Sequence, residues 1–131
     1  MIFVDSGGWF SLVVTSDPNH ARVLAVIDEA IDSLITTDYV VDETLTLLRA
    51  RGEVRRAIEL GHQFFEGDLS SVHRITDIEL LRAWHIFRDY SDKGWSFTDC
   101  TSKAVIESYN IATAISFDRH FSQFGTVQIL P

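Results

Sequence analysis

Ile2-Phe3-Val4-Asp5-Ser6-Gly7-Gly8 is the segment from which the architecture of the chain can be worked out. Its three apolar residues predict a short buried strand, which Asp5 ends. A carboxylate at this point costs strand stability, but it suits the carboxyl edge of an α/β sheet, where ligands bind. We therefore expect residues 2–5 to form a strand of such a sheet, with Asp5 at its functional edge.

Short apolar runs alternate with helical periodicity along the rest of the chain. Further strands are predicted at 34–37, 71–75, 111–117 and 127–130. A first helix is predicted over 9–14, and later helices start at polar residues that can cap them. These are Asp17 before Pro18, Asp38, Asp77 and Thr98, and the predicted helix ends are Gly52, Gly67 and Asn110.

Apolar residues at helical spacing predict which faces of these helices are buried. The predicted stripes are Leu24, Ile27, Ile31 and Leu34; Val41, Leu45 and Leu48; Val54, Ala57, Ile58, Gly61 and Phe65; and Leu80, Trp84 and Phe87.

Strands that alternate with helices indicate an α/β fold with helices on both faces of a mainly parallel sheet. The expectation is a three-layer α/β/α domain with a central five-stranded sheet. With 131 residues and no visible boundary, residues 1–131 are predicted to form a single domain.

Composition limits the class of function. The formal net charge of −8 argues against a simple nucleic-acid-binding module, but it argues less against a nuclease whose carboxylates a metal neutralises. A single cysteine, Cys100, favours the reducing cytoplasm. No secretory signal or membrane-spanning run is recognisable, so a cytoplasmic protein with no membrane partner is expected.

Four carboxylates stand at comparable points of the predicted fold. Asp5 and Asp118 follow strands directly, whereas Glu43 and Asp99 lie in the first turns of helices. These positions share one edge of a parallel sheet, so the sequence predicts an acidic cluster there. Such a cluster repels itself unless hard cations such as Mg²⁺ or Mn²⁺ are bound. Asp99 and Glu43 also suit a helix dipole, and Asp42 competes with Glu43 for the role.

The chain resembles a PIN domain, and most closely the VapBC-type toxin ribonucleases. The family has an Asp after strand one, a Glu in the helix after strand two, an Asp at a later helix start and an Asp-x-x-Phe after the fourth strand. The matching segments are Val4-Asp5-Ser6, Asp42-Glu43, Ser96-Phe97-Thr98-Asp99-Cys100 and Ser116-Phe117-Asp118-Arg119-His120-Phe121. One departure is that Ser116 supplies the hydroxyl where the family has Thr.

The resemblance implies a PIN-like fold and a Mg²⁺-dependent endoribonuclease, the toxin of a toxin–antitoxin pair. Its partners would be an RNA substrate, a cognate antitoxin and a second copy in a homodimer. Asp5, Glu43, Asp99 and Asp118 would be both catalytic residues and metal ligands, with Mn²⁺ as the other candidate ion. A metal-activated water would cleave the phosphodiester and leave a 3′ hydroxyl and a 5′ phosphate.

Several other residues are candidates for supporting roles. Ser6, Thr98 and Ser116 place hydroxyls beside the acids, where they can orient a carboxylate or a water. A basic cluster could hold RNA phosphates or an acidic partner, or simply be solvated; it comprises Arg49, Arg51, Arg55 and Arg56. Cys100 is interpreted as a buried side chain rather than a nucleophile. His120 lies nearest the acids, and Phe64, Phe65, Trp9 and Phe10 are either core or apolar surface for a partner.

Three other classes of function compete with a nuclease. A receiver-type signalling domain needs an acidic pair after strand one and a late Lys, but no Lys follows Lys103. A phosphoaspartyl phosphatase needs Asp-x-Asp, and position 7 is Gly. A catalytically silent PIN-like domain that binds protein or RNA stays open as the alternative to a nuclease.

Overall fold

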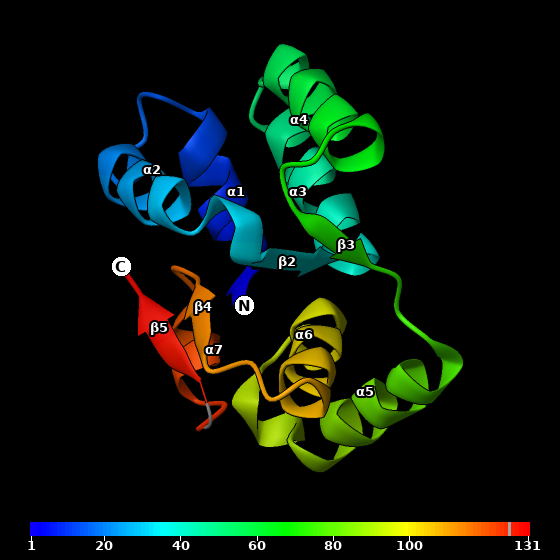
Figure 1. The fold of residues 1–131 in the computed structure, drawn as a ribbon. Coiled ribbons are helices and arrows are strands. Elements are labelled where there is room, and N and C mark those ends of the chain that lie inside the picture. The colour runs from blue at the N-terminus through cyan, green and yellow to red at the C-terminus, as the bar shows by residue number, and fades with distance from the viewer. Residues whose placement is uncertain (126) are drawn as a thin grey trace.

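The structure is a computed structural model that describes residues 1–125 and 127–131, with every side chain in these ranges except that of Asp32. Strands and helices alternate along it as the sequence predicts (Figure 1). The strands are β1 (Ile2–Val4), β2 (Leu34–Thr37), β3 (Ser71–His73), β4 (Thr113–Ile115) and β5 (Gln128–Leu130). The helices are α1 (Ser6–Val13), α2 (His20–Glu29), α3 (Asp38–Ala50), α4 (Val54–Glu66), α5 (Asp77–Asp89), α6 (Phe97–Ser108) and α7 (Arg119–Ser122), with short 3₁₀ turns at Ile31–Ser33 and Ser91–Lys93.

In the described part of the chain the strands form one five-stranded sheet in the order β3-β2-β1-β4-β5, and every neighbouring pair is parallel. Figure 1 shows α1 to α4 on one side of the strands and α5 and α6 on the other. The predicted three-layer α/β/α class is therefore confirmed. Because all strands run the same way, their carboxyl ends meet at one edge.

The first strand lies at the centre of the sheet and of the core. Phe3 and Val4 are fully buried, as is Trp9 on the helix that follows. Gly8 lets α1 approach the sheet closely: a Cβ at this position would lie 2.9 Å from side-chain carbons of both Ile115 and Val4. The segment 2–9 thus fixes the central strand and the helix packed against it.

Several helices begin at residues other than those predicted. The predicted caps Asp38 and Asp77 are instead first helical residues, because Thr37 and Thr76 precede them in extended conformation and accept the backbone N–H three residues on. A β-branched hydroxyl residue at the end of an extended segment competes well with Asp for this position.

The starts of α6 and α2 differ in the same way. Ser96, not Thr98, caps α6 and forms a capping box with Asp99. α2 begins at His20 rather than Pro18, because the Asp17 carboxylate accepts the Asn19 N–H and closes a turn instead.

The buried faces of three helices also differ from prediction. On α4, Ala57 is buried as expected, but Leu60 and Phe64 complete the face, while Val54, Ile58 and Phe65 are exposed. On α2, Val23 and Ile27 are buried while Leu24 is exposed, and Ile31, exposed as well, lies beyond the helix in a 3₁₀ turn. On α5, Ala83 and Ile86 are buried, and Trp84 and Phe87 are exposed. In each case apolar residues occur on more than one face, so spacing alone does not identify the packed face.

Among the described residues, no helix combines the length and apolar character needed to cross a membrane.

Candidate functional site

The carboxyl edge of the sheet brings together the acids that the sequence places at element ends. Asp5 follows β1, and its N–H donates to the carbonyl of Ile115 at the end of the neighbouring β4. Glu43 lies on α3, which follows β2, and Asp99 lies in the first turn of α6. Asp118 follows β4 and caps α7. The observed topology therefore gives each acid a place on the same edge.

Asp5 and Asp118 are joined by Ser116. The Ser116 hydroxyl donates to Asp5 Oδ2 at 3.1 Å and accepts the backbone N–H of Asp118 at 3.1 Å. The other oxygen, Asp5 Oδ1, is buried and accepts no hydrogen bond of good geometry from any described residue. A buried carboxylate oxygen without a partner is costly, so the Asp5 carboxylate is suited to bind a cation.

The electrostatics of Asp5 follow from this burial. Removal from water raises its pKa to about 7, and the nearby charges of Glu43 and Asp99 act in the same direction. The Ser6 N–H and the Ser116 hydroxyl lower the pKa but do not offset the rise. Burial therefore favours the protonated form of Asp5 relative to an exposed carboxyl.

Glu43 is held toward the cluster by Ser6, whose hydroxyl donates to Glu43 Oε1 at 2.6 Å. Its pKa is raised, chiefly by burial and further by the charges of Asp99, Asp118 and Asp42. Its interaction with both Asp99 and Asp118 indicates that α3 turns this carboxylate into the same space. Asp42 is exposed on α3 and is not the residue that Ser6 holds.

Asp99 and Asp118 are linked by a histidine. His120 Nδ1 lies 3.2 Å from Asp99 Oδ2 and 3.2 Å from Asp118 Oδ1. One ligand atom from each of these three residues lies within 4.8 Å of the others. The capping box with Ser96 fixes Asp99: Asp99 Oδ2 accepts the Ser96 N–H, and the Ser96 hydroxyl accepts the Asp99 N–H, each at 3.0 Å.

The donor set fits a hard divalent cation. Carboxylate oxygens are the ligands that Mg²⁺ and Mn²⁺ prefer, and one of them, Asp5 Oδ1, is buried without a partner among the described residues. Acids that raise one another's pKa are stabilised by a shared positive ion. His120 adds a nitrogen that Mn²⁺ accepts more readily than Mg²⁺ does.

The three hydroxyl residues predicted to support the acids differ in the contacts that they make. Ser6 contacts Glu43 rather than its neighbour Asp5, and Ser116 contacts Asp5. The Thr98 hydroxyl forms no hydrogen bond with a described residue, although its carbonyl accepts from Thr101. Cys100 is fully buried, and burial raises the pKa of its thiol to about 11, so it is a packing residue as interpreted from the sequence.

Two residues contribute to the site without being predicted to. Ser96 shares its capping box with Asp99, and a signal for it exists, since Ser-x-x-Asp before an apolar run is a capping-box pattern. His120 is the histidine nearest the acids in the sequence, but it is not among the predicted site residues. Its contact with Asp99 joins residues 21 positions apart, which no local pattern reveals.

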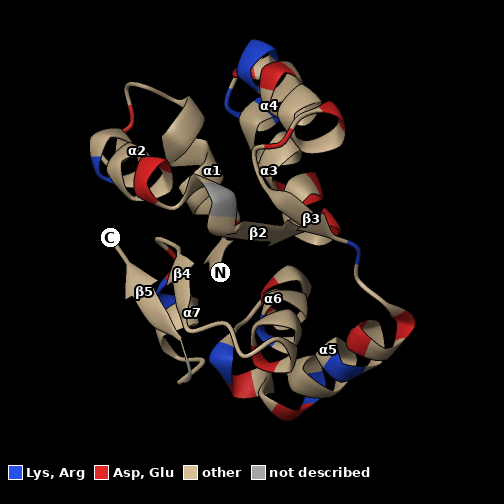
Figure 2. Ribbon diagram, viewed as in Figure 1, with Lys and Arg blue, Asp and Glu red and all other residues tan. Residues whose placement is uncertain are grey.

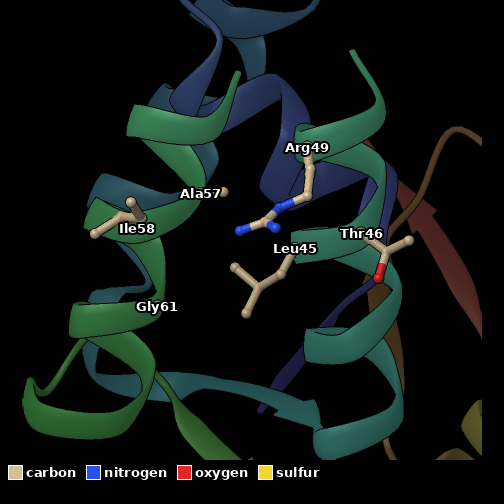
Figure 3. Close-up of a pocket in the computed structure, with 6 residues that line it drawn as sticks. All are labelled: Leu45, Thr46, Arg49, Ala57, Ile58 and Gly61. Atoms are coloured by element: carbon tan, nitrogen blue, oxygen red, sulfur yellow. The ribbon is translucent and has the colours of Figure 1, made fainter. Parts of the chain in front are cut away.

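The basic cluster is divided by the structure. In Figure 2 the ribbon is blue, marking basic residues, where α3 gives way to α4. Arg49 lines a groove of about 430 Å³ between these helices, and Figure 3 shows its side chain reaching across that groove from α3, close to Leu45. Arg56 is paired with Glu53 at 2.6 Å. Arg55 is exposed, while Arg51 lies over the ring of Phe10 at 6.0 Å.

The aromatic residues considered as partner surface are mostly core. Trp9 is fully buried and Phe64 nearly so, packed edge to face with centroids 5.0 Å apart. Phe10 is half-buried, and Phe65 is exposed.

Known proteins are similar to this chain in sequence and in fold. The PIN domain family matches residues 2–127. The 23S rRNA-specific endonuclease VapC20 of Mycobacterium tuberculosis is 30% identical over 131 residues, which cover 100% of this chain and 99% of that protein. Its crystal structure, described as a sarcin-ricin loop cleaving toxin, superposes with a TM-score of 0.91 at 28% identity, covering 100% of both chains.

A further relative by sequence and a further solved structure of the same fold also match this chain. A VapC ribonuclease of Archaeoglobus fulgidus is 28% identical over 124 residues, which cover 91% of this chain and 78% of that protein. VapBC2 of Rickettsia felis, solved bound to a DNA fragment from its promoter, shares the fold at 9% identity with a TM-score of 0.72, covering 98% of this chain and 97% of that one. By sequence and by fold, the chain belongs to the PIN-domain family and groups there with the proteins named VapC.

Proposed function

We propose that this protein is a Mg²⁺-dependent endoribonuclease, the toxin of a toxin–antitoxin pair, built as a single domain over residues 1–131. The observation that carries the proposal is the gathering of Asp5, Glu43, Asp99 and Asp118 at one edge of the sheet. One oxygen of Asp5 is buried and unpartnered among the described residues, and Asp99 and Asp118 lie within 4.8 Å of each other and of His120. The relatives named as VapC endonucleases and ribonucleases support it.

Each acid has a proposed role in the reaction. Asp5 and Asp99 would hold Mg²⁺ or Mn²⁺, and Glu43 and Asp118 would complete the shell directly or through water. The bound ion would supply Lewis-acid assistance to the attacking water and to the leaving 3′ oxygen. Ser116 and Ser6 fix the Asp5 and Glu43 carboxylates, so the chain presents them ready for a cation. The products would be a 3′ hydroxyl and a 5′ phosphate.

The proposed setting is the cytoplasm, with an RNA substrate, a cognate antitoxin that restrains the nuclease, and a homodimeric toxin. The R. felis relative by fold was solved as VapBC2, and this supports an antitoxin partner. The single cysteine, which is buried and free, supports a reducing compartment.

Paired variants test the nuclease. Asp99→Asn should abolish cleavage of RNA in Mg²⁺ and lose Mg²⁺ binding by calorimetry, while circular dichroism shows an intact fold. The matched control is Asp42→Asn, an exposed acid on the same helix as Glu43, which should cleave at close to the parent's rate. Undiminished cleavage by Asp99→Asn, or by the parent protein in excess chelator, would sink the proposal.

The alternative, a catalytically silent PIN-like domain, predicts different results in the same experiments. A silent PIN-like domain would bind RNA or its protein partner equally well as parent and as Asp99→Asn. It would leave RNA uncut in both Mg²⁺ and Mn²⁺. The four intact acids favour the nuclease, because a binding module has no need of a cluster that repels itself.

A further inference from the structure

A pocket beside the acidic cluster has no role in the function proposed so far. It has a volume of about 230 Å³ and is lined chiefly by Gly7, Phe10, Leu47, Arg51 and Phe117. Its walls come from α1, the segment between α1 and α2, the C-terminal part of α3 with Arg51 just beyond it, and the segment after β4. Asp5 immediately precedes α1, Glu43 lies on α3 and Asp118 lies after β4. The pocket therefore opens where these elements meet, next to the acids.

None of the four acids lines the pocket, but several lining residues are close neighbours of the site residues in the chain. Phe117 stands between Ser116, which contacts Asp5, and Asp118. Gly7 follows Ser6, which holds Glu43, and Leu47 lies one helical turn beyond Glu43 on α3. A molecule in this pocket would thus be a direct neighbour of whatever the acids act on.

The chemistry of the lining is that of a nucleotide site. Phe117 leaves 39% of its surface exposed, which is unusual for Phe and gives a base a free ring face to stack on. Arg51 is exposed and lies over the Phe10 ring, so its guanidinium is positioned at the pocket and can pair with a phosphate. An aromatic platform beside a cation is the usual combination for single-stranded nucleic acid.

Glycine keeps the pocket open. A Cβ on Gly7 would sit 3.7 Å from the Phe117 ring and backbone, in ordinary contact, so any larger side chain would fill the space beside the ring. One carboxylate, Asp17, also lines the pocket, but it accepts hydrogen bonds from the Ser11 hydroxyl and the Asn19 N–H. Those donors weaken its repulsion of a phosphate.

We propose that this pocket binds one unpaired nucleotide of the RNA substrate adjacent to the cleaved bond, with its base stacked on Phe117 and its phosphate held by Arg51. The inference rests on the proposed nuclease function and deepens it. Because a stacked base must leave its helix, the substrate must be single-stranded at this position. The inference also separates Arg51 from Arg49, Arg55 and Arg56, which lie away from the pocket.

Binding measurements test the two contacts separately. The probe is a short fluorescein-labelled single-stranded RNA, with the duplex of the same sequence for comparison, bound to protein that carries Asp99→Asn to prevent cleavage. Phe117→Leu should weaken single-strand binding by about tenfold, and Phe117→Tyr should restore it, because Tyr stacks and Leu does not. Arg51→Gln should weaken binding and reduce the slope of log Kd against log salt by about 0.7. The control Arg55→Gln should leave both quantities near the parent values.

The outcomes distinguish this inference from the proposed function. If the parent protein cleaves RNA but Arg51→Gln and Phe117→Leu bind it as tightly as the parent, the nucleotide pocket is wrong and the nuclease stands. The pocket is also wrong if both variants lose binding to an antitoxin while RNA binding is unchanged, or if duplex binds as well as single strand. If the parent cleaves no RNA, the nuclease proposal fails, whereas the binding series alone decides whether the pocket holds a nucleotide.

Discussion

Asp5 shows how one residue can be costly to the fold and necessary for the site. Its backbone belongs to the sheet edge, where its N–H donates to Ile115 and its carbonyl accepts from Trp9. Its carboxylate is nearly fully buried, with one oxygen unpartnered among the described residues, and burial raises its pKa to about 7. The fold therefore prefers the protonated acid unless a cation replaces the proton.

This preference predicts how stability depends on pH. The pKa of Asp5 in the folded state lies above its unfolded value of 3.8. Between pH 3.8 and about 7 the folded state therefore binds more protons than the unfolded state. The free energy of unfolding falls as the pH rises through this window. The loss from Asp5 alone amounts to at most ~4 kcal/mol. In chelator, Asp5→Asn should be more stable than the parent at about pH 8 and show a flatter pH profile.

Urea unfolding of both proteins at several pH values measures this difference. Glu43, whose pKa is raised in the same direction, adds to the slope in both proteins. Because its charge interacts with that of Asp5, Asp5→Asn also reduces the contribution of Glu43, so the flattening of the profile reports on the pair. Saturating Mg²⁺ should raise the stability of the parent and leave Asp5→Asn almost unchanged. Parallel pH profiles in chelator would show that Asp5 is ionised in the fold at no cost.

At the scale of elements, helix starts place the acids. α1 begins at the residue after Asp5, α6 holds Asp99 in its first turn, and α7 is capped by Asp118. Negative charge is stabilised at helix N-termini, so these elements offset part of the repulsion within the cluster. The first residue and the packing of each of these helices thus determine where its acid lies in the site.

The start of α6 supplies a prediction. Ser96→Ala removes the side-chain acceptor of the Asp99 N–H and should lower the free energy of unfolding by about 1 kcal/mol. It should also reduce Mg²⁺ affinity, because it frees the Asp99 backbone. The matched control is Thr98→Val two residues later, whose hydroxyl makes no hydrogen bond with a described residue, so the change should be small. If Thr98→Val costs as much as Ser96→Ala, the capping box is not the feature that fixes Asp99.

The close packing of α1 against the sheet leads to a second prediction for the elements. Gly8→Ala would place a methyl group 2.9 Å from carbons of Val4 and Ile115, so α1 must move off the sheet, at a cost of roughly 1–3 kcal/mol. Gly7→Ala is the control, since its Cβ meets Phe117 at 3.7 Å and Ala suits a helix better than Gly. Thermal unfolding of the two variants tests this. Equal stability would mean that α1 is not held as closely as the contact implies.

The sequence predicts the strands and their shared edge better than it predicts the exact ends of helices or the contacts between distant residues. Strand 34–37 and the common edge of the acids could be predicted, because alternation of strands and helices implies a parallel sheet. The helix caps could not be placed to the residue, because Thr37 and Asp38 are both good caps and the extended backbone of Thr37 decides between them. The link from His120 to Asp99 depends on tertiary packing, which no spacing encodes.

In the described part of the chain, α4 and α5 both carry exposed apolar side chains; those on α4 are Val54, Ile58 and Phe65. α5 packs Ala83 and Ile86 inward, yet on its outer side Ile78, Leu81 and Trp84 are exposed by 81%, 57% and 49%. Exposed apolar side chains gathered on one helix indicate an interaction surface. Of the residues considered as partner surface, Trp9 and Phe64 are buried, Phe10 is half-buried and Phe65 is exposed on α4, so α5 is a second candidate for this surface beside α4.

A second copy of the chain suits this face, because α5 is self-complementary in charge. Exposed Asp77 lies at its start and exposed Arg88 near its end, where Arg88 also pairs with Asp89 at 2.8 Å; Figure 2 shows acidic residues at both ends of α5 and basic ones between them. Two α5 helices packed antiparallel would bring Asp77 of each toward Arg88 of the other, across the apolar centre. The proposed homodimer is therefore expected to form through α5.

Leu81→Glu tests the expected dimer, because it places a carboxylate at the centre of the apolar face, where in the dimer it would face a second one. We expect the dimer dissociation constant to rise by roughly 30-fold or more, with thermal stability of the monomer little changed. The control Phe65→Glu alters an exposed aromatic on α4 and should leave the dimer intact. Sedimentation equilibrium distinguishes the results. A parent protein that stays monomeric would exclude self-association. A Leu81→Glu variant that dimerises like the parent would place the dimer interface away from α5. Loss of the dimer in Phe65→Glu would assign the interface to α4.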